Sequence, residues 1–577
     1  MLNHHPLVFE LEKLKESSRE AVADSNAKIE DELKKYLHIE RPVETHLRDI
    51  ISKAKESDKA QLILVCGNVG DGKSHILSLL KDDIGTDFKV HNDATESFEP
   101  QGSCIDTLDE ILTPFSDENI ESARDKWILA INLGTLSNFL EEKSDRYQEL
   151  RKYVEKNQIL SSDVDVEPEQ EEHQYFKFVN FTDYHLYTLT SQGIKAAIVD
   201  DLFDKVAAND KKNPIYRAYL SIKDEPWGEK CPVVLNYEFF LKEPNRKLLS
   251  SLLIQVLLKE KKIFSFRRLL NFIHDIIVPY NLELSSFDEY TKKIVTKWNT
   301  KKLPDYLIPF YLFENPNISK IFKGLGSMDP CLSRIEKLDE RLIHLNITDK
   351  PSEHFQELLT EYSQAKELLE AIDKNNEKEK ISRLYIRLYF FAYYREFEAL
   401  DYFKDYSTAL YAFNSGNIRA LRSSYDMVKE AILKWNGNTS TMNKVLIPLA
   451  VNQEKYRVFK DVELEEVLPK KSTDKEVFLQ FYPQLKLTFE HPSEKGKEIT
   501  VDIDYSLYVL LRMVIKGYRP NQLDRRNYIK FTRFLDELTL SGASNQKLYV
   551  DEVNLGKAID FIIAYNSKYE EFTFSKN

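Results

Sequence analysis

The chain has 577 residues, of which 42% are hydrophobic and 30% are charged. A chain of this length exceeds what one hydrophobic core supports, so we expect two to four folded domains. The formal net charge of −13 argues against a protein that coats nucleic acid by bulk electrostatics, because such binding needs an excess of Lys and Arg.

The four cysteines, Cys66, Cys104, Cys231 and Cys331, lie far apart and form no CxxC pair. Neither a zinc site nor a disulfide framework is therefore expected. The first residues lack a basic segment followed by an apolar one, and no run approaches 18 apolar residues. We expect a cytoplasmic protein that does not contact a membrane.

In chain order, residues 8–58 show helical periodicity that only Pro42 interrupts. This pattern predicts an N-terminal helical arm and then a helix from about Val43 to Ala54.

The segment QLILVCGNVGDGKSHIL at positions 61–77 carries the most information. A buried-strand run, Leu62–Cys66, leads into Gly67-x4-Gly72-Lys73-Ser74, which is the Walker A or P-loop pattern in its proper context. Glycines let such a loop curl so that backbone N–H groups face phosphate oxygens, while the Lys reaches the β- and γ-phosphates and the Ser binds Mg²⁺. We expect ATP and Mg²⁺ as cofactors, held by Gly67, Asn68, Val69, Gly70, Asp71, Gly72, Lys73, Ser74 and His75.

Further strands are expected at residues 88–91, 127–131 and 176–181, with a last one at 231–236. Strands that alternate with helices predict a parallel, doubly wound α/β sheet with its site at the carboxyl ends of the strands. Asn132 directly follows the strand 127–131. It is either a catalytic residue that senses the γ-phosphate or positions water, or an Asn that only begins a turn.

The acidic residue that usually accompanies a P-loop is not clear-cut. Asp93 follows a short strand amid turn residues, and we rank it first as a catalytic and Mg²⁺-binding residue. Asp200 and Asp201 follow an apolar run that is equally good as a helix, and Glu238 lies just past the strand expected at 231–236. A site that binds ATP and turns it over slowly is also compatible with this pattern.

Residues 246–278 have helical periodicity without a proline, which is typical of a helical lid after a nucleotide-binding sheet of the AAA+ class. Arg267, within this run, is either a contact to the γ-phosphate or part of an exposed basic pair with Arg268.

An aromatic helical run at 381–406 carries Arg383, Arg387 and Arg395, which either contact nucleic acid or form the charged edge of a core. Period-two segments around HPSEKGK predict a β-hairpin, and a helix is expected at 505–516. The best basic patch, either a contact for DNA or an acidic partner or a solvated helix face, is Arg519, Arg525, Arg526, Lys530 and Arg533.

These patterns predict an α/β P-loop NTPase domain with an AAA+ or STAND-like parallel sheet and a helical lid. A mainly α C-terminal region with a small β-hairpin follows. The expected domains are an N-terminal arm at 1–45, the NTPase core at 46–245, the lid region at 246–375 and the C-terminal domain at 376–577.

With these motifs placed, the chain resembles the DptF family, the ATPase-like component of bacterial restriction systems that depend on DNA phosphorothioation. The resemblance lies in VCGNVGDGKSHILSLLK (65–81), KVHNDATESFEP (89–100), IDTLDEILTPFSD (105–117) and WILAINLGTLSNFLEE (127–142), and more weakly in SFRRLLNFIHDIIVP (265–279).

The resemblance implies an anti-phage role, in which DptG-like and DptH-like subunits join this chain to damage DNA that lacks the phosphorothioate mark. No nuclease motif of the PD-(D/E)xK or HNH type is visible, so we expect DNA to be reached through the complex. The alternative is a STAND-type signalling or scaffolding NTPase, possible as an oligomer, in which nucleotide state gates assembly without DNA contact.

Overall fold

The computed structural model describes residues 5–16, 32–68, 70–92, 103–160, 173–225, 227–228, 231–260, 264–280, 303–332, 336–348, 358, 378–394, 397–437, 444–448, 455–469, 473, 475–491, 496–540, 547–552, 561–566 and 568–576. They form two compact units, residues 1–188 with 195–397 and residues 189–194 with 398–577. The expected C-terminal domain overlaps the second unit except for helix α20 (Lys378–Ala392), which belongs to the first.

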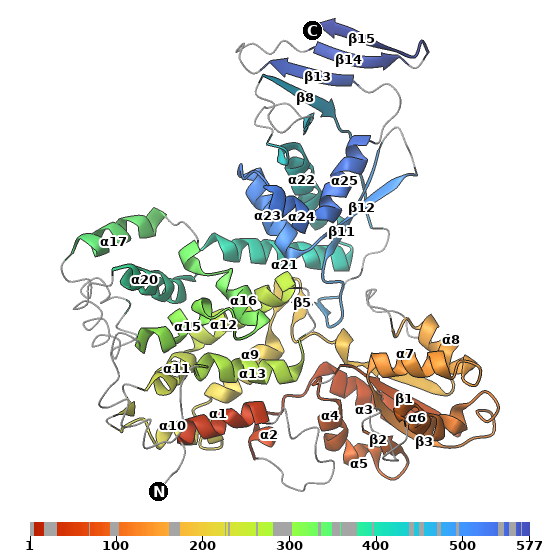
Figure 1. The fold of residues 1–577 in the computed structure, drawn as a ribbon. Helices are drawn as coiled ribbons and strands as arrows, with labels where there is room; N and C mark the ends of the chain where they lie inside the picture. Colours follow the sequence, from red (N-terminus) through yellow and green to blue (C-terminus); the bar gives the residue numbers. More distant parts are fainter. Residues whose placement is uncertain are drawn as a thin grey trace. The chain divides into compact units, whose positions relative to one another are not determined.

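A four-stranded parallel sheet in the order β2-β3-β1-β4 organises the first part of unit 1 (Figure 1). The expected α/β architecture with a parallel sheet is thereby confirmed. All six residues of the central strand β1 are buried, as expected for a strand covered on both faces. The strands are β1 (Gln61–Cys66), β2 (Lys89–His91), β3 (Lys126–Ile131) and β4 (Phe176–Asn180).

Alternate residues of β1 enter two separate hydrophobic cores, because successive side chains of a strand point to opposite faces. Leu62 and Leu64 pack with side chains from α6, α7 and α8. Ile63 and Val65 pack with side chains from α3, α4 and α5. These helices are α3 (Pro42–Lys55), α4 (Lys73–Leu79), α5 (Lys81–Ile84), α6 (Cys104–Leu112), α7 (Leu133–Glu142) and α8 (Gln148–Lys156), with the 3₁₀ turns η2 (Thr113–Phe115) and η3 (Phe181–Asp183).

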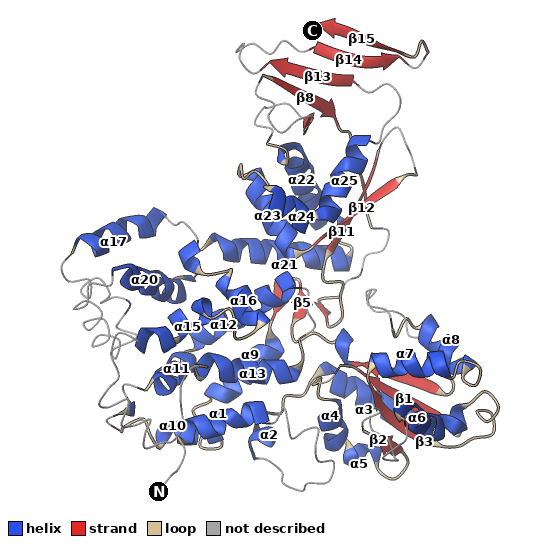
Figure 2. Ribbon diagram, viewed as in Figure 1, coloured by secondary structure: helices blue, strands red, loops and turns tan. Residues whose placement is uncertain are grey.

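The rest of unit 1 is helical, as the blue ribbons of Figure 2 show. The N-terminal helix α1 packs on α10, α11 and α13, so the start of the chain lies in one helical layer with residues 214–277. The helices are α1 (Pro6–Glu16), α2 (Glu32–Leu37), α9 (Ala197–Ala207), α10 (Pro214–Leu220), α11 (Pro232–Leu241), α12 (Glu243–Glu260), α13 (Phe266–Ile277), α15 (Ile308–Glu314), α16 (Lys320–Gly326), α17 (Glu336–Ile347) and α20, with the 3₁₀ turns η5 (Leu303–Tyr306) and η6 (Pro330–Leu332).

The strand expected at 231–236 is wrong, because these residues begin helix α11. Pro232 occupies the first helical position, where its fixed φ suits a helix and its missing N–H costs nothing. The helix is buried on most sides, so its sequence is apolar without a 3.6-residue period and looks the same as a buried strand. The run 197–207 likewise takes its helical alternative, α9, and the long run 246–278 divides into α12 and α13.

Unit 2 combines helices with three small sheets, in the strand orders β10-β5-β6, β12-β11-β9 and β15-β14-β13-β8-β7. The expected hairpin is present as β11 paired with β12, whereas β10 pairs with β5 instead of extending it. The elements are β5 (Thr188–Thr190), β6 (Gly193–Lys195), α21 (Glu398–Ser415), α22 (Ile418–Lys434), β7 (Lys444–Ile447), β8 (Tyr456–Asp461), β9 (Glu465–Val467), β10 (Val477–Phe478), β11 (Leu485–Glu490), β12 (Glu498–Ile503), α23 (Tyr505–Ile515), α24 (Gln522–Asn527), α25 (Ile529–Leu540), β13 (Lys547–Glu552), β14 (Phe561–Asn566) and β15 (Glu571–Lys576).

Candidate functional site

A glycine loop, residues 67–72, leaves the carboxyl end of β1 and leads into α4. Its three glycines have φ angles of 153°, 89° and 87° at Gly67, Gly70 and Gly72, a range that side chains other than hydrogen rarely allow. A Cβ on Gly67 would lie 2.9 Å from the Cβ of Phe181, and one on Gly72 would lie 2.9 Å from Nη2 of Arg41. The backbone conformation therefore favours glycine at all three positions, and the close approach of the Phe181 Cβ requires it also at Gly67.

Lys73 turns back over the loop that precedes it. Its Nζ donates to the carbonyl oxygens of Gly67 at 2.8 Å and Asn68 at 2.9 Å. The buried Asp71 carboxylate accepts the Asn68 N–H at 2.7 Å, and burial is the main cause that raises the pKa of Asp71. The Lys73 ammonium group thus lies at the loop, and the buried Asp71 carboxylate holds the loop backbone through its hydrogen bond to Asn68.

As in α3 and α5, the first turn of α4 has no side-chain cap. Gly72 is its N-cap and offers no side-chain acceptor. By contrast, α6, α7 and α13 begin with Ser103, Asn132 and Ser265, each of which accepts a backbone N–H of its own first turn. The N–H groups at the start of α4 are therefore not covered by a capping side chain.

Arg41, just before α3, contacts the loop from one side. Its Nη1 donates to the carbonyl oxygen of Asp71 at 2.9 Å. Its guanidinium carbon lies 5.5 Å from the ring centroid of Phe181 and 5.3 Å from that of Phe266. Burial lowers the pKa of Arg41 to about 10, against the opposing effect of Asp71 and Glu44. No sequence pattern singles out this residue, because an Arg before a helix-starting Pro is ordinary.

Arg267 contacts the loop from the start of α13. Its backbone N–H donates to the carbonyl oxygen of Gly70 at 3.3 Å. A Cβ on Gly70 would lie 3.2 to 3.4 Å from the Cβ, Cδ and Nε of Arg267, so this side chain lies over the glycine. The structure thus brings together two residues that are nearly two hundred positions apart, whereas Arg268 beside it is exposed.

Asn132 follows β3, the neighbour of β1 in the sheet. Its Oδ1 accepts the Thr135 N–H at 2.7 Å and the Thr135 hydroxyl at 2.9 Å. The side chain thus caps α7, in line with the alternative in which it begins a turn. Its catalytic role stays a prediction.

The end of β4, on the other side of β1, supplies a carboxylate that the sequence did not indicate. Asn180 pairs with Cys66 in the sheet register, and its Nδ2 donates to Asp183 Oδ1 at 2.8 Å. Burial raises the pKa of Asp183 to about 6. Asp183 follows the Phe181 whose Cβ packs on Gly67, so this acid belongs to the same edge of the sheet as the glycine loop.

Two of the predicted site residues, Val69 and Asp93, lie outside the described residues. Ser74, the predicted Mg²⁺ ligand, is exposed, and its hydroxyl lies 3.5 Å from the carbonyl oxygen of Asn92. The Ser74 side chain therefore lies next to Asn92, the residue that precedes Asp93. Within the described part of the chain, no group of three or more His, Cys, Asp or Glu side chains is placed to hold a metal ion.

The remaining predicted residues, His75, Glu238 and Asp200, all lie on helices. His75 is an exposed residue of α4, with its ring centroid 5.6 Å from that of His38. Glu238 lies inside α11 and accepts the Tyr219 hydroxyl at 2.9 Å. Asp200 is in the first turn of α9, so neither acid follows a strand of the parallel sheet.

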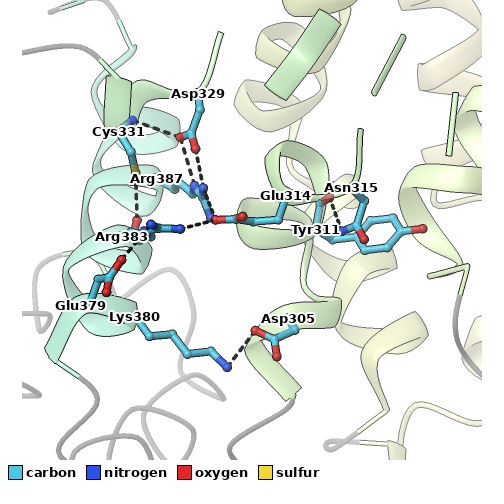
Figure 3. Close-up of polar contacts among 10 residues, drawn as sticks. All are labelled: Asp305, Tyr311, Glu314, Asn315, Asp329, Cys331, Glu379, Lys380, Arg383 and Arg387. Carbon is cyan, nitrogen blue, oxygen red and sulfur yellow. Dashed lines mark hydrogen bonds and ion pairs between the residues drawn. The ribbon is translucent and has the colours of Figure 1, made fainter. Parts of the chain in front are cut away.

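The aromatic run near residue 387 is a core with a charged edge. Arg387 is fully buried, and Figure 3 shows it between Glu314 and Asp329. Its Nη2 donates to Glu314 at 2.7 Å and also bonds Asp329, while Arg383 bonds Glu314 and Glu379. The ring centroid of Phe310 lies 4.5 Å from the guanidinium carbon of Arg387. A buried arginine with these partners cannot contact nucleic acid, and Arg395 is outside the described residues.

The basic segment around residues 519–533 remains on the surface of unit 2. Arg525 is partly buried and donates to Asn436 Oδ1 at 2.9 Å. The exposed members are Arg519, Arg526, Lys530 and Arg533. Their role as a patch for DNA or an acidic partner stays a prediction.

Comparison of the chain with protein-family models and with curated proteins finds no match. Among the described residues, no helix has the length and apolar character needed to cross a membrane.

Proposed function

We propose that residues 67–74 bind the phosphates of ATP with Mg²⁺, and that the chain is the ATP-dependent subunit of a phosphorothioation-dependent DNA restriction complex. The ATP part rests on the loop and is argued from its contacts. The restriction part rests on the sequence resemblance to the DptF family.

One observation carries the ATP proposal: four carbonyl oxygens of the loop are bonded to donors. Lys73 Nζ bonds those of Gly67 and Asn68, the Arg267 N–H bonds that of Gly70, and Arg41 Nη1 bonds that of Asp71. Carbonyl oxygens repel phosphate, whereas N–H groups and cations attract it. A loop whose carbonyl oxygens are already bonded to cations and N–H donors is suited to binding an anion.

The residues present also fit the charge of a nucleotide. Lys73 would exchange two carbonyl oxygens for phosphate oxygens, and Arg267 adds a third cation at the loop to Lys73 and Arg41. Ser74 offers a hydroxyl for Mg²⁺ close to the segment that leads to Asp93. When bound, Mg²⁺ would neutralise phosphate charge and favour phosphoryl transfer.

The binding test is the substitution Lys73→Ala, measured by calorimetric titration with ATP in Mg²⁺ buffer. Loss of charge-assisted phosphate contacts should weaken ATP binding at least about tenfold. Lys81→Ala, at an exposed lysine of the next short helix, is the matched control and should bind ATP as the parent does. Equal ATP affinity in Lys73→Ala and the parent would contradict the proposal.

The restriction role needs a separate experiment in cells. We expect the chain to purify with DptG-like and DptH-like subunits, and Lys73→Ala to abolish restriction of unmodified phage or plasmid DNA. Purification without such subunits, together with intact restriction by Lys73→Ala, would refute this role while leaving ATP binding untouched.

A further inference from the structure

Strand β15 forms an open edge of the five-stranded sheet in unit 2 (Figure 2). It pairs with β14 along its whole length, and β14 is its one neighbour among the strands that the structure describes. All six of its residues are exposed. Its outer side therefore presents backbone N–H and C=O groups that can pair with another strand.

Two large aromatic side chains stand on this edge. Phe572 is 63% exposed and Phe574 is 73% exposed, and they share a sheet face because they are two residues apart. In the register with β14, they lie opposite Tyr565 and Ile563. The apolar face of the sheet therefore continues to its last strand and ends there uncovered.

The opposite edge of the same sheet is protected. Strand β7 has four residues and packs on α22. The Asn436 side chain donates to the carbonyl oxygen of Leu446 in this strand at 2.8 Å. Covering and shortening an edge strand are two of the ways in which proteins prevent unwanted pairing, and β15 shows neither of these two.

The sequence of β15, EFTFSK at 571–576, has a symmetric centre, Phe572-Thr573-Phe574. A two-fold axis perpendicular to a sheet places a central residue opposite its own copy. With Thr573 at the centre, Phe572 lies opposite Phe574 of the second copy, and Glu571 lies opposite its Ser575. Each of these pairs occurs twice, and aromatic pairs across strands are stabilising.

We propose that β15 pairs antiparallel with β15 of a second copy of this chain, centred on Thr573, and so joins two five-stranded sheets. This register keeps all four phenylalanines on one face, whereas a slip by one residue would move one copy's aromatic side chains to the opposite face. One strand pair is a small interface, so the dimer forms and dissociates with concentration. It does not depend on the nucleotide site.

Cysteine substitution in the full chain tests the register. Opposed Cα atoms in an antiparallel pair are about 4.5 to 5.5 Å apart, a separation that a disulfide spans. Thr573→Cys should therefore give a disulfide-linked dimer under mild oxidation. Ser575→Cys, whose thiol faces Glu571 of the second copy, should not, and neither should the parent with its native cysteines. Absence of the dimer in Thr573→Cys, or equal cross-linking of Ser575→Cys, would overturn the proposal.

A charged substitution tests the same contact without cross-linking, by sedimentation equilibrium over a range of concentrations. Phe574→Glu places a carboxylate opposite Phe572 of the second copy in both aromatic pairs, and should raise the dimer dissociation constant at least about fivefold. Tyr569→Glu, at an exposed aromatic residue in the turn before the strand, is the control of equal charge change and should dimerise as the parent does. A monomer of the parent at every concentration, or equal dimerisation of Phe574→Glu and the parent, would refute the pairing.

Discussion

Replacing Arg41 by Met should weaken ATP binding without removing any group that we assign to the phosphates. Arg41 donates to the Asp71 carbonyl oxygen at 2.9 Å and lies between the rings of Phe181 and Phe266. Met keeps the length and the apolar packing of the side chain but loses the charge and the donor. The change therefore isolates the polar contacts by which Arg41 holds the loop.

The magnitude follows from these contacts. A hydrogen bond from a charged donor contributes about 1.5 to 3 kcal/mol, and each cation–π contact about 0.5 to 1 kcal/mol at a partly exposed site. Met carries no charge and so avoids the desolvation cost that lowers the pKa of the Arg41 guanidinium. This offsets part of the lost contact energy. A net loss of about 2 kcal/mol in the free energy that holds the loop in its binding conformation would raise the dissociation constant for ATP about 30-fold. Arg41→Lys should lie between, because an ammonium keeps the charge but not the planar fork.

The assay is calorimetric titration with ATP at constant Mg²⁺, combined with urea unfolding of each variant. Arg48→Met is the matched control, since Arg48 lies in α3, the helix that follows Arg41, and pairs with Glu40, Glu44 and Asp83 away from the loop. ATP binding by Arg41→Met equal to that by Arg48→Met, while Lys73→Ala binds poorly, would refute the role of Arg41 in ordering the loop.

Three further predictions concern the sheet edge and the buried ion cluster. Burial raises the pKa of Asp183 from 3.8 to about 6. As the pH rises, the unfolded chain therefore releases this proton first, and the native state loses stability between about pH 4 and 6. The urea midpoint of Asp183→Asn relative to that of the parent should rise over this pH window, and a difference that does not change with pH would contradict the prediction. Asn132→Ala should lower the free energy of unfolding by about 1 kcal/mol, as should Asn417→Ala at the α22 cap, but only Asn132→Ala should slow ATP turnover. Arg387→Met should cost about 1.5 to 3 kcal/mol in chemical denaturation because it removes the hydrogen bonds from a buried guanidinium to the partly exposed Glu314 and Asp329 carboxylates, and its DNA binding should equal the parent's.

The elements that could be predicted from the sequence are those whose information is local. The strand β1, the three glycines and Lys73 are contiguous, so their pattern alone indicated the turn and the cation at its end. The parallel strands β2, β3 and β4 followed from short apolar runs between helical ones. The helix α11 was mistaken for a strand because its burial on most sides removes the period that separates the two.

The parts of the site that escaped prediction depend on tertiary packing. Arg41 reaches the loop only because α3 packs on the sheet, and nothing in its neighbourhood in the sequence marks a buried guanidinium. Asp183 owes its raised pKa to burial at the end of β4, which a sequence pattern does not specify. Arg267 was named from its helix-start position, but its contact with Gly70 required the fold of the helical region.

If ATP binds at this loop as proposed, the loop contacts divide into those that ATP would break and those that it would leave in place. Lys73 bonds two loop carbonyl oxygens with the same ammonium group that would contact phosphate, so binding requires it to exchange partners. Arg41 uses Nη1 on the carbonyl of Asp71, and Arg267 uses its backbone N–H on that of Gly70. The Arg267 guanidinium therefore remains available for phosphate while its backbone holds α13 to the loop. A movement of the loop on ATP binding would be transmitted directly to α13, which is the connection that a nucleotide-gated subunit needs.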